Sequence, residues 1–311
     1  MKVFYSDHFV LPLPEGHRFP MVKYSMLRER VAQDGICGPG ELLTPRAVTD
    51  EEILRAHTPD YLRRVVCGKL SDKEMRRIGF PWSEKMVERS RRASGGTLGA
   101  CLTALEEGFA ANLAGGTHHA FSARGEGYCV FNDSAIAARA VQDAGLVERV
   151  LIIDTDVHQG NGTAEILRTD PTVFTFSIHG AKNFPFRKEE SDLDAPLPDG
   201  TDDTEFLAAL ERGLEAALDA ADAELAIYLA GADPFEGDRL GRLSVTKEGL
   251  AEPDRIVLET CTERSIPVAT TMAGGYATEV EDTVDVHLQS IRRAADLLKS
   301  TADRSKEPQG T

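Results

Sequence analysis

The sequence lacks the marks of a membrane protein, a secreted protein and a disulfide-stapled domain. No part of the 311-residue chain approaches the roughly 18 consecutive apolar residues that a membrane-spanning helix needs. The N-terminal segment has no apolar stretch ending in small residues, so no signal peptide is expected. The five cysteines are odd in number and form no CxxC pair, which predicts reduced thiols and no thiolate zinc site. These absences predict a cytoplasmic protein that binds no membrane.

Positive charge is also scarce. The chain has 35 Lys and Arg against 51 Asp and Glu, a formal net charge of −16. This balance argues against a surface that follows nucleic-acid phosphates, so nucleic acid is not an expected partner. An acidic surface would suit a cationic substrate such as a lysine-rich segment, although net charge of this kind mostly serves solubility. The sequence leaves the oligomeric state open.

Two kinds of pattern follow each other along the chain. The first hundred residues are mostly helical in pattern, and from residue 111 short apolar runs alternate with helical stretches. The apolar runs are 111–114, 150–153, 173–176, 225–229 and 268–271, and the helical stretches are 133–144, 203–221, 246–264 and 279–299. This alternation predicts a parallel sheet with helices on its faces. No linker is visible, so we expect a single domain over 1–300 and a disordered polar tail at 301–311.

Polar residues follow each of the five apolar runs. In open parallel sheets, ligands bind at the carboxyl ends of the strands, because the loops there converge. The segments at those places are Gly115–His119, Asp154–His158, Ser177–His179, Gly231–Pro234 and Ala273–Tyr276. They would bring His, Asp, Ser and Tyr to one edge of the sheet, which a purely structural sheet does not require.

The segment from Asp154 to His158 indicates a metal site. In an extended chain the side chains of Asp154, Asp156 and His158 would share one face. A catalytic divalent ion takes three protein ligands and leaves one position for water; Asp156 and His158 would supply two, and Asp233 is the candidate for the third. Alone, an Asp-x-His motif is more often explained by an aspartate that caps the next helix. The combination with Asp233 and a histidine pair favours metal.

The adjacent His118 and His119 and the later Tyr276 complete the candidate chemistry. The two histidines could be metal ligands, or one or both could transfer protons beside a metal-bound water; spacing does not separate these roles. Tyr276, after Gly274 and Gly275, suits a hydroxyl that donates to a developing oxyanion. Taken alone, a tyrosine is more often a surface or packing residue.

At these residues the sequence resembles a known superfamily. The matching segments are LAGGTHHAFSARGEGYCVFND, VLIIDTDVHQGNGTAEIL, FSIHGAKNFP, LAGADPFEGDRLGRLSVT and MAGGY, which occur in the expected order between about residues 10 and 280. The chain resembles the arginase and histone deacetylase superfamily, and within it the bacterial relatives of class IV histone deacetylases. The resemblance implies a three-layer α/β fold on a mainly parallel eight-stranded sheet. It also implies zinc-dependent hydrolysis of the amide bond of N-acyl-lysine.

The resemblance implies a role for each matching position. The zinc ligands would be Asp156, His158 and Asp233. His119 would be the general base and acid, with His118 as its electrostatic partner, and Tyr276 the oxyanion donor. The substrate-binding residues would be the Gly127 carbonyl, the channel walls Tyr128 and Phe184, and Leu240 near the channel mouth. A structural potassium ion would be held by Asp154, Ser177 and the carbonyls of Ile178, Asp156 and His158.

One position departs from the family pattern. Behind the second histidine many class I members have an aspartate, whereas this chain has Asn161. A neutral partner orients the imidazole but stabilises its protonated form less than a carboxylate does. The proton balance between His118 and His119 therefore stays open at the level of sequence.

Other functions remain in view. An acetylpolyamine amidohydrolase would share the metal site, but such relatives are expected to have a glutamate near Leu240; the aliphatic Leu240 favours acyl-lysine, although Glu236 is nearby. An arginase-type two-manganese site would need more carboxylates. A non-catalytic acyl-lysine binder is disfavoured by Tyr276 and both histidines. Iron(II) could replace zinc, because an Asp, His, Asp set discriminates weakly between the two metals.

Overall fold

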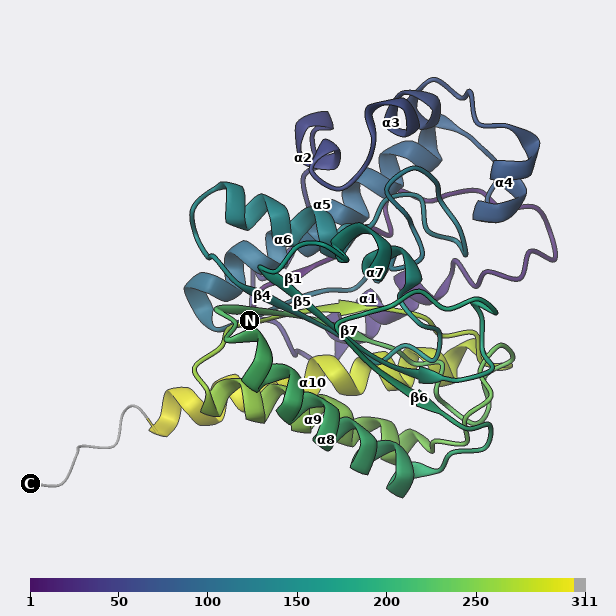
Figure 1. Cartoon of the computed structure of the whole chain (residues 1–311). Coiled ribbons are helices and arrows are strands. Elements are labelled where there is room, and N and C mark those ends of the chain that lie inside the picture. Colours follow the sequence, from purple (N-terminus) through teal and green to yellow (C-terminus); the bar gives the residue numbers. More distant parts are fainter. Residues whose placement is uncertain (305–311) are drawn as a thin grey trace, which may run out of the picture.

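The computed structural model describes residues 1–304, and within them one eight-stranded sheet runs through the middle of the molecule (Figure 1). All neighbouring strands are parallel, in the order β2-β1-β3-β8-β7-β4-β5-β6. The strands are β1 (Val3–Phe4), β2 (Leu42–Leu43), β3 (Phe109–Asn112), β4 (Val150–Asp154), β5 (Val173–Gly180), β6 (Leu193–Leu197), β7 (Leu225–Ala230) and β8 (Val268–Met272). The predicted eight-stranded parallel sheet is confirmed.

Helices cover both faces of the sheet, which makes three layers (Figure 1). One layer contains α1 (Lys23–Gln33), α8 (Asp203–Ala221), α9 (Lys247–Glu263) and α10 (Val280–Arg304). The other contains α2 (Asp50–Leu54), α3 (Pro59–Val66), α4 (Asp72–Ile78), α5 (Glu84–Glu107), α6 (Asp133–Asp143) and α7 (Asn161–Leu167). Each layer encloses its own apolar core against the sheet.

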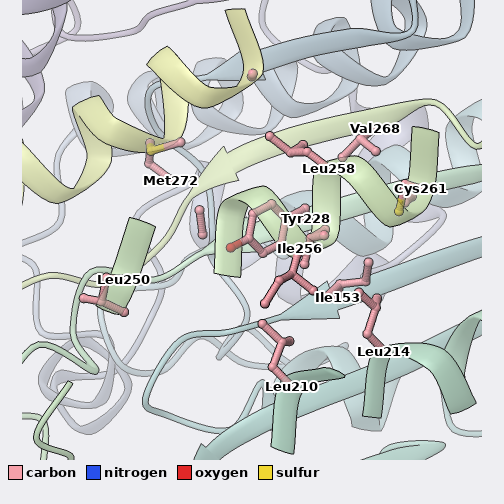
Figure 2. Close-up of a cluster of buried hydrophobic side chains, with 14 of the residues drawn as sticks. Ile153, Leu210, Leu214, Tyr228, Leu250, Ile256, Leu258, Cys261, Val268 and Met272 are labelled. Atoms are coloured by element: carbon pink, nitrogen blue, oxygen red, sulfur yellow. The ribbon is translucent and has the colours of Figure 1, made fainter. Parts of the chain in front are cut away.

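The central strand β4 shows how one strand serves both cores. Leu151 and Ile153 belong to one core, and Val150 and Ile152 to the other, because successive side chains of a strand point to opposite faces. Figure 2 shows Ile153 directed toward Leu214 of α8 in the first of these cores. Burial on both faces explains why this strand is a continuous apolar run rather than an alternating one.

Helix α5 is a long helix in the part of the chain that was expected to be mostly helical. Ser83 caps its first turn by accepting the backbone N–H of Met86. A Cβ on Gly95 would lie 1.8 Å from the carbonyl oxygen of Arg46. Glycine at position 95 therefore permits close packing of α5 against the segment that contains Arg46.

Several short elements were not predicted. They are β1, β2, β6, α4 and α7. Strands of two residues and helices of seven are too short to leave a periodic pattern, and β6 is an edge strand that contains Pro196. β3 begins two residues earlier than the apolar run suggested. These differences change element boundaries but not the architecture.

Three further sequence predictions concern the chain as a whole. Helix α10 continues to Arg304, four residues into the segment expected to be a tail, and residues 305–311 lie outside the described residues. The five cysteines are free thiols. Within residues 1–304 no helix combines the length and the apolar character that crossing a bilayer would require.

Candidate active site

The predicted site residues meet at one end of the sheet. β3, β8, β7, β4 and β5 are consecutive neighbours, so the loops after them converge at their carboxyl ends. A cavity of about 550 Å³ opens there. The predicted residues that line it are His118, His119, Gly127, Tyr128, Asp156, His158, Phe184, Leu240 and Tyr276. The predicted residues that are buried without lining it are Asp154, Asn161, Ser177, Ile178 and Asp233.

Asp156, His158 and Asp233 form a compact buried group. One ligand atom from each lies within 4.8 Å of the other two. Nδ1 of His158 lies 2.9 Å from Oδ1 of Asp156 and 3.1 Å from Oδ2 of Asp233. Burial, followed by the charge of Asp156, raises the pKa of Asp233 to about 7 despite the neighbouring His158. Two carboxylates and an imidazole, buried and held this close together, are a donor set that fits zinc.

Backbone amides and one glycine direct the two carboxylates of this group. The N–H of Val157 donates to Oδ1 of Asp233 at 2.8 Å, and the N–H of Gly274 donates to Oδ2 of Asp156 at 2.6 Å. A Cβ on Gly274 would lie 1.9 Å from Oδ2 of Asp233 and 2.5 Å from Oδ2 of Asp156. Only glycine allows β8 to end this close to both acids.

The expectation that Asp154, Asp156 and His158 share one face of a strand is wrong. β4 ends at Asp154, and the next residues form a bent loop. The N–H of Asp156 donates to Oδ1 of Asp154 at 3.1 Å, a local side-chain bond that turns the chain. Asp156 and His158 consequently face Asp233, while Oδ2 of Asp154 lies 2.7 Å from Nδ1 of His118. Asp154 is a partner of the histidine pair rather than a member of the metal group.

His118 and His119 differ in the group behind each ring. Nδ1 of His118 faces the carboxylate of Asp154. Nδ1 of His119 lies 2.7 Å from Oδ1 of Asn161, whose oxygen also accepts the N–H of Gly162. Since Asn161 presents its oxygen, Nδ1 of His119 is the protonated nitrogen and Nε2 is left as an acceptor. The two ring centroids are only 4.1 Å apart.

These partners separate the charges of the two histidines. Burial lowers the pKa of His118, but Asp154 and Asp156 outweigh it and raise the pKa to about 9. Burial also lowers the pKa of His119, and the charges of His118 and His158 lower it further, to well below 6.5. At neutral pH His118 is therefore a cation and His119 a neutral imidazole that can accept a proton. The tertiary structure answers a question that the spacing left open.

Tyr276 lines the same cavity with its hydroxyl protonated. Burial, followed by the charges of Asp156 and Asp233, raises the pKa of Tyr276 well above 10. The turn that carries it is pinned, because the N–H of Tyr276 donates to Oδ2 of Asp238 at 2.5 Å and its carbonyl accepts Nε of Arg239 at 2.9 Å. The backbone of Tyr276 is thus fixed, and its side chain both packs in one of the two cores and lines the cavity.

Gly127, Tyr128 and Phe184 form walls of the cavity. Gly127 has a φ of +54°, and a Cβ there would lie 2.6 Å from Cδ2 of His119, so the position requires glycine. The Phe184 ring stands edge-on to His119, with 5.0 Å between ring centroids and an angle of 84°. The ring of Tyr128 lies 5.9 Å from that of Tyr276. These contacts place aromatic surfaces around the entry to the histidines and the metal group.

Three of the five residues predicted to hold potassium lie on two paired strands. Asp154 of β4 and Ser177 of β5 are register partners, and both are buried. Oγ of Ser177 lies 3.0 Å from Nδ1 of His179. Ile178 follows on the same strand and is also buried. The potassium site stays a prediction.

Lys23 is a cavity residue that the sequence analysis missed. It is 3% exposed, and its Nζ donates to the carbonyl of Gly275 at 3.3 Å. The amine also lies 5.3 to 5.6 Å from the ring centroids of Phe19, Tyr24 and Tyr276. A signal was present, because Lys23 begins the i, i+4, i+8 series completed by Leu27 and Val31, the buried stripe of α1.

The mouth of the cavity, which we define by Arg76, Arg77, Lys182 and Arg242, is basic. The idea of an acidic surface that attracts a cationic substrate is wrong at this opening, since whole-chain charge says nothing of local distribution. Glu236 does not line the cavity, whereas Leu240 does.

Comparison with known proteins agrees with this geometry. The profile of the histone deacetylase domain matches residues 17–291, which span nearly the whole described chain. The chain belongs to the histone deacetylase family. Membership indicates a hydrolase that acts on amides, and it supports deacetylase activity in general.

Similar proteins and solved structures cover most of the chain. An uncharacterized protein of Picosynechococcus is 46% identical over 295 residues, 95% of this chain and 98% of that protein. The acetoin utilization protein AcuC of Bacillus subtilis is 32% identical, covering 78% of this chain and 66% of that one. The crystal structure of a histone deacetylase homologue from Aquifex aeolicus superposes with a TM-score of 0.79 at 25% identity, over 96% of this chain and 88% of that one. The crystal structure of a histone deacetylase homologue in complex with SAHA superposes with a TM-score of 0.80 at 26% sequence identity, with the same coverage of both chains.

Proposed function

We propose that the protein hydrolyses the amide bond of N-acyl-lysine with a zinc ion held by Asp156, His158 and Asp233. The observation that carries this proposal is the convergence of these three buried ligands, the neutral His119 and the hydroxyl of Tyr276 on one cavity. When bound there, zinc would polarise the substrate carbonyl and lower the pKa of a water molecule from about 15.7 towards 7. Iron(II) is the alternative metal, because the ligand set does not select strongly against it.

His119 is proposed as the group that moves the proton. Its Nε2 is free to accept the proton of the attacking water, because Nδ1 is bonded to Asn161. It then returns that proton to the leaving amine of lysine. His118 stays protonated beside Asp154, and its positive charge keeps His119 neutral until the reaction begins.

Tyr276 and the walls position the substrate. The Tyr276 hydroxyl donates to the oxyanion that develops on the carbonyl, an effect commonly worth about 3 to 4 kcal/mol. The Gly127 carbonyl accepts the N–H of the scissile amide. Tyr128 and Phe184 enclose the aliphatic arm of the acyl-lysine, and Leu240 contacts the substrate near the mouth. A potassium ion at Asp154, Ser177 and the Ile178 carbonyl would hold the ends of β4 and β5 together.

The alternative is an acetylpolyamine or another small N-acyl amine as substrate. Two observations favour acyl-lysine over a polyamine. The residue at the cavity near the mouth is Leu240 rather than an acid, and the cations of the mouth would repel the second ammonium of a polyamine. A non-catalytic acyl-lysine binder would have no use for the neutral His119 and the protonated Tyr276. Location in the cytoplasm remains part of the proposal.

The test is turnover of lysine peptides that carry acyl groups from acetyl to myristoyl by the zinc-loaded protein. His119→Ala and Tyr276→Phe should each lower kcat by roughly 100-fold, the usual size of acid–base and oxyanion effects. Tyr61→Phe is the matched control, because Tyr61 is a buried tyrosine that donates to the Val130 carbonyl and does not line the cavity. It should retain wild-type kcat.

Two results would contradict the proposal. A protein that binds zinc but cleaves no acyl-lysine of any length is a binder rather than an enzyme. Faster turnover of acetylspermidine than of the best peptide would assign the protein to the polyamine class.

A further inference from the structure

The charge at the mouth of the cavity is opposite in sign to the net charge of the molecule. The chain has a net charge of −16, yet Arg76, Arg77, Lys182 and Arg242 border the opening that leads to the metal group. Among the residues that line the cavity, the acids are Glu126 and the buried Asp156. Glu126 lies 3.6 Å from Arg124, so its charge is already offset. The positive charge at the mouth therefore does not follow from the overall composition of the chain and indicates a specific role for these cations.

Arg76 and Arg77 are the uncompensated part of this patch. Both are exposed in the last turn of α4, and within residues 1–304 neither forms an ion pair. Their backbone is fixed to the cavity wall, because the N–H of Gly127 donates to the Arg77 carbonyl at 3.1 Å. The adjacent N–H of Tyr128 donates to the Ile78 carbonyl at 2.7 Å. The backbone hydrogen bonds therefore fix the positions from which the two guanidinium groups extend, beside the proposed substrate channel.

Lys182 and Arg242 border the opening from other segments of the chain. They share one acid, Asp199, at 3.7 and 3.4 Å, so this trio keeps a net positive charge. Lys182 and Arg242 are 72% and 52% exposed, which leaves both free to reorient toward a ligand. Phe186 lines the same opening and is 87% exposed, which provides an apolar surface beside the cations.

We infer that the preferred substrate is an acidic peptide segment, in which aspartate or glutamate residues flank the acyl-lysine. This inference rests on the proposed deacylase function. Arginine binds carboxylates through paired N–H donors, and several cations around one cleft add their fields. Cations from α4 and from the loops that contain Lys182 and Arg242 all line the cavity, which favours a peptide with several acids over a small N-acyl amine.

The same cations separate substrate from product. An acyl-lysine side chain is neutral and enters without electrostatic cost. After hydrolysis the side chain carries an ammonium group, and the cations of the mouth repel it. A basic mouth thus favours entry of the acylated form and departure of the free lysine.

The experiment compares three peptides of equal length, with acidic, neutral or basic residues on both sides of one acyl-lysine. On the zinc-loaded wild type, kcat/KM should be about 10-fold higher for the acidic than for the neutral peptide, and lowest for the basic one. The difference should lie mainly in KM. It should shrink at about 1 M salt, where the Debye length is only ~3 Å.

Charge reversal tests the assignment to the mouth. The double variant Arg76→Glu with Arg77→Glu, and separately Arg242→Glu, should reduce the acidic preference, with the larger loss in the double variant because Asp199 already offsets part of the Arg242 charge. Arg212→Glu is the matched control, since Arg212 is exposed on α8 and does not line the cavity. It should keep the full preference.

The outcomes distinguish this inference from the proposed function. No hydrolysis even of the neutral peptide contradicts the function itself. Hydrolysis of all three peptides with equal kcat/KM, or with the basic one fastest, overturns only the inference. If the three peptides have equal kcat/KM and millimolar inorganic phosphate inhibits the enzyme, the mouth binds a small anion. That result also overturns the inference of an acidic peptide.

Discussion

The floor and the mouth of the cavity are built in opposite ways. The floor is the cavity-lining Asp156, His158, His118 and His119 together with Asp233, which is buried beside His158. The floor consists of loops that directly follow neighbouring strands, and its residues are buried and tied by hydrogen bonds. The mouth comes from the end of α4 and from two later loops, and its cations are exposed. Burial strengthens the electrostatic interactions of each charge in the floor, whereas solvent weakens those of each charge at the mouth. Changes in the floor should therefore abolish function, and changes at the mouth should tune it.

The strongest way to break this comparison is to remove one ligand from the floor. Asp233→Asn should abolish stoichiometric zinc binding and lower kcat/KM by at least about 100-fold, because a neutral amide cannot replace a buried carboxylate ligand. Metal content and acyl-peptide turnover measure the two effects.

The control for that change is Asp254→Asn. Asp254 is another buried acid, bonded by the hydroxyls of Tyr228 and Ser290 away from the metal group. It should keep its zinc. If Asp233→Asn also keeps one zinc per chain, the metal group is wrongly assigned.

An intermediate effect is expected from Asn161→Asp, which adds a charge behind His119 without removing a ligand. A carboxylate 2.7 Å from Nδ1 would stabilise protonated His119 and raise its pKa by about 1 to 3 units. A base must be deprotonated to act, so the acidic limb of kcat/KM should move to higher pH by at least about one unit. The loss should grow as the pH falls and disappear as the pH rises above the new pKa of His119.

The pH profile of Gln33→Glu provides the comparison, since it adds the same charge at an exposed position of α1. Its acidic limb should stay with that of the wild type. An unchanged limb in Asn161→Asp would mean that His119 is not the base.

The smallest effect is expected at the mouth. Leu240→Glu should raise the ratio of acetylspermidine to acetyl-lysine peptide turnover by about 3- to 10-fold, because an exposed carboxylate attracts the second ammonium only weakly. A larger change, or loss of all activity, would show that this position acts like the floor. Leu240→Gln controls for side-chain shape without charge.

Much of the site could be predicted because strand ends in a parallel sheet must converge. The apolar runs gave the strands, and the polar residues after them gave His118, His119, Asp156, His158, Asp233 and Tyr276. The prediction failed in local geometry. The alternation argument predicted that Asp154 shares one face with Asp156 and His158, but the chain bends where the N–H of Asp156 donates to Asp154, and Asp154 faces His118 instead.

By itself, the sequence determined the main alternation of strands and helices and the types of the candidate ligands. These are properties of short segments, set by periodicity and residue size. Tertiary structure alone decided which histidine is charged, that a lysine of α1 reaches the cavity, and that the opening of an acidic protein is basic. Each of these depends on charges and rings from distant segments, and electrostatic interactions follow distance in space rather than position along the chain.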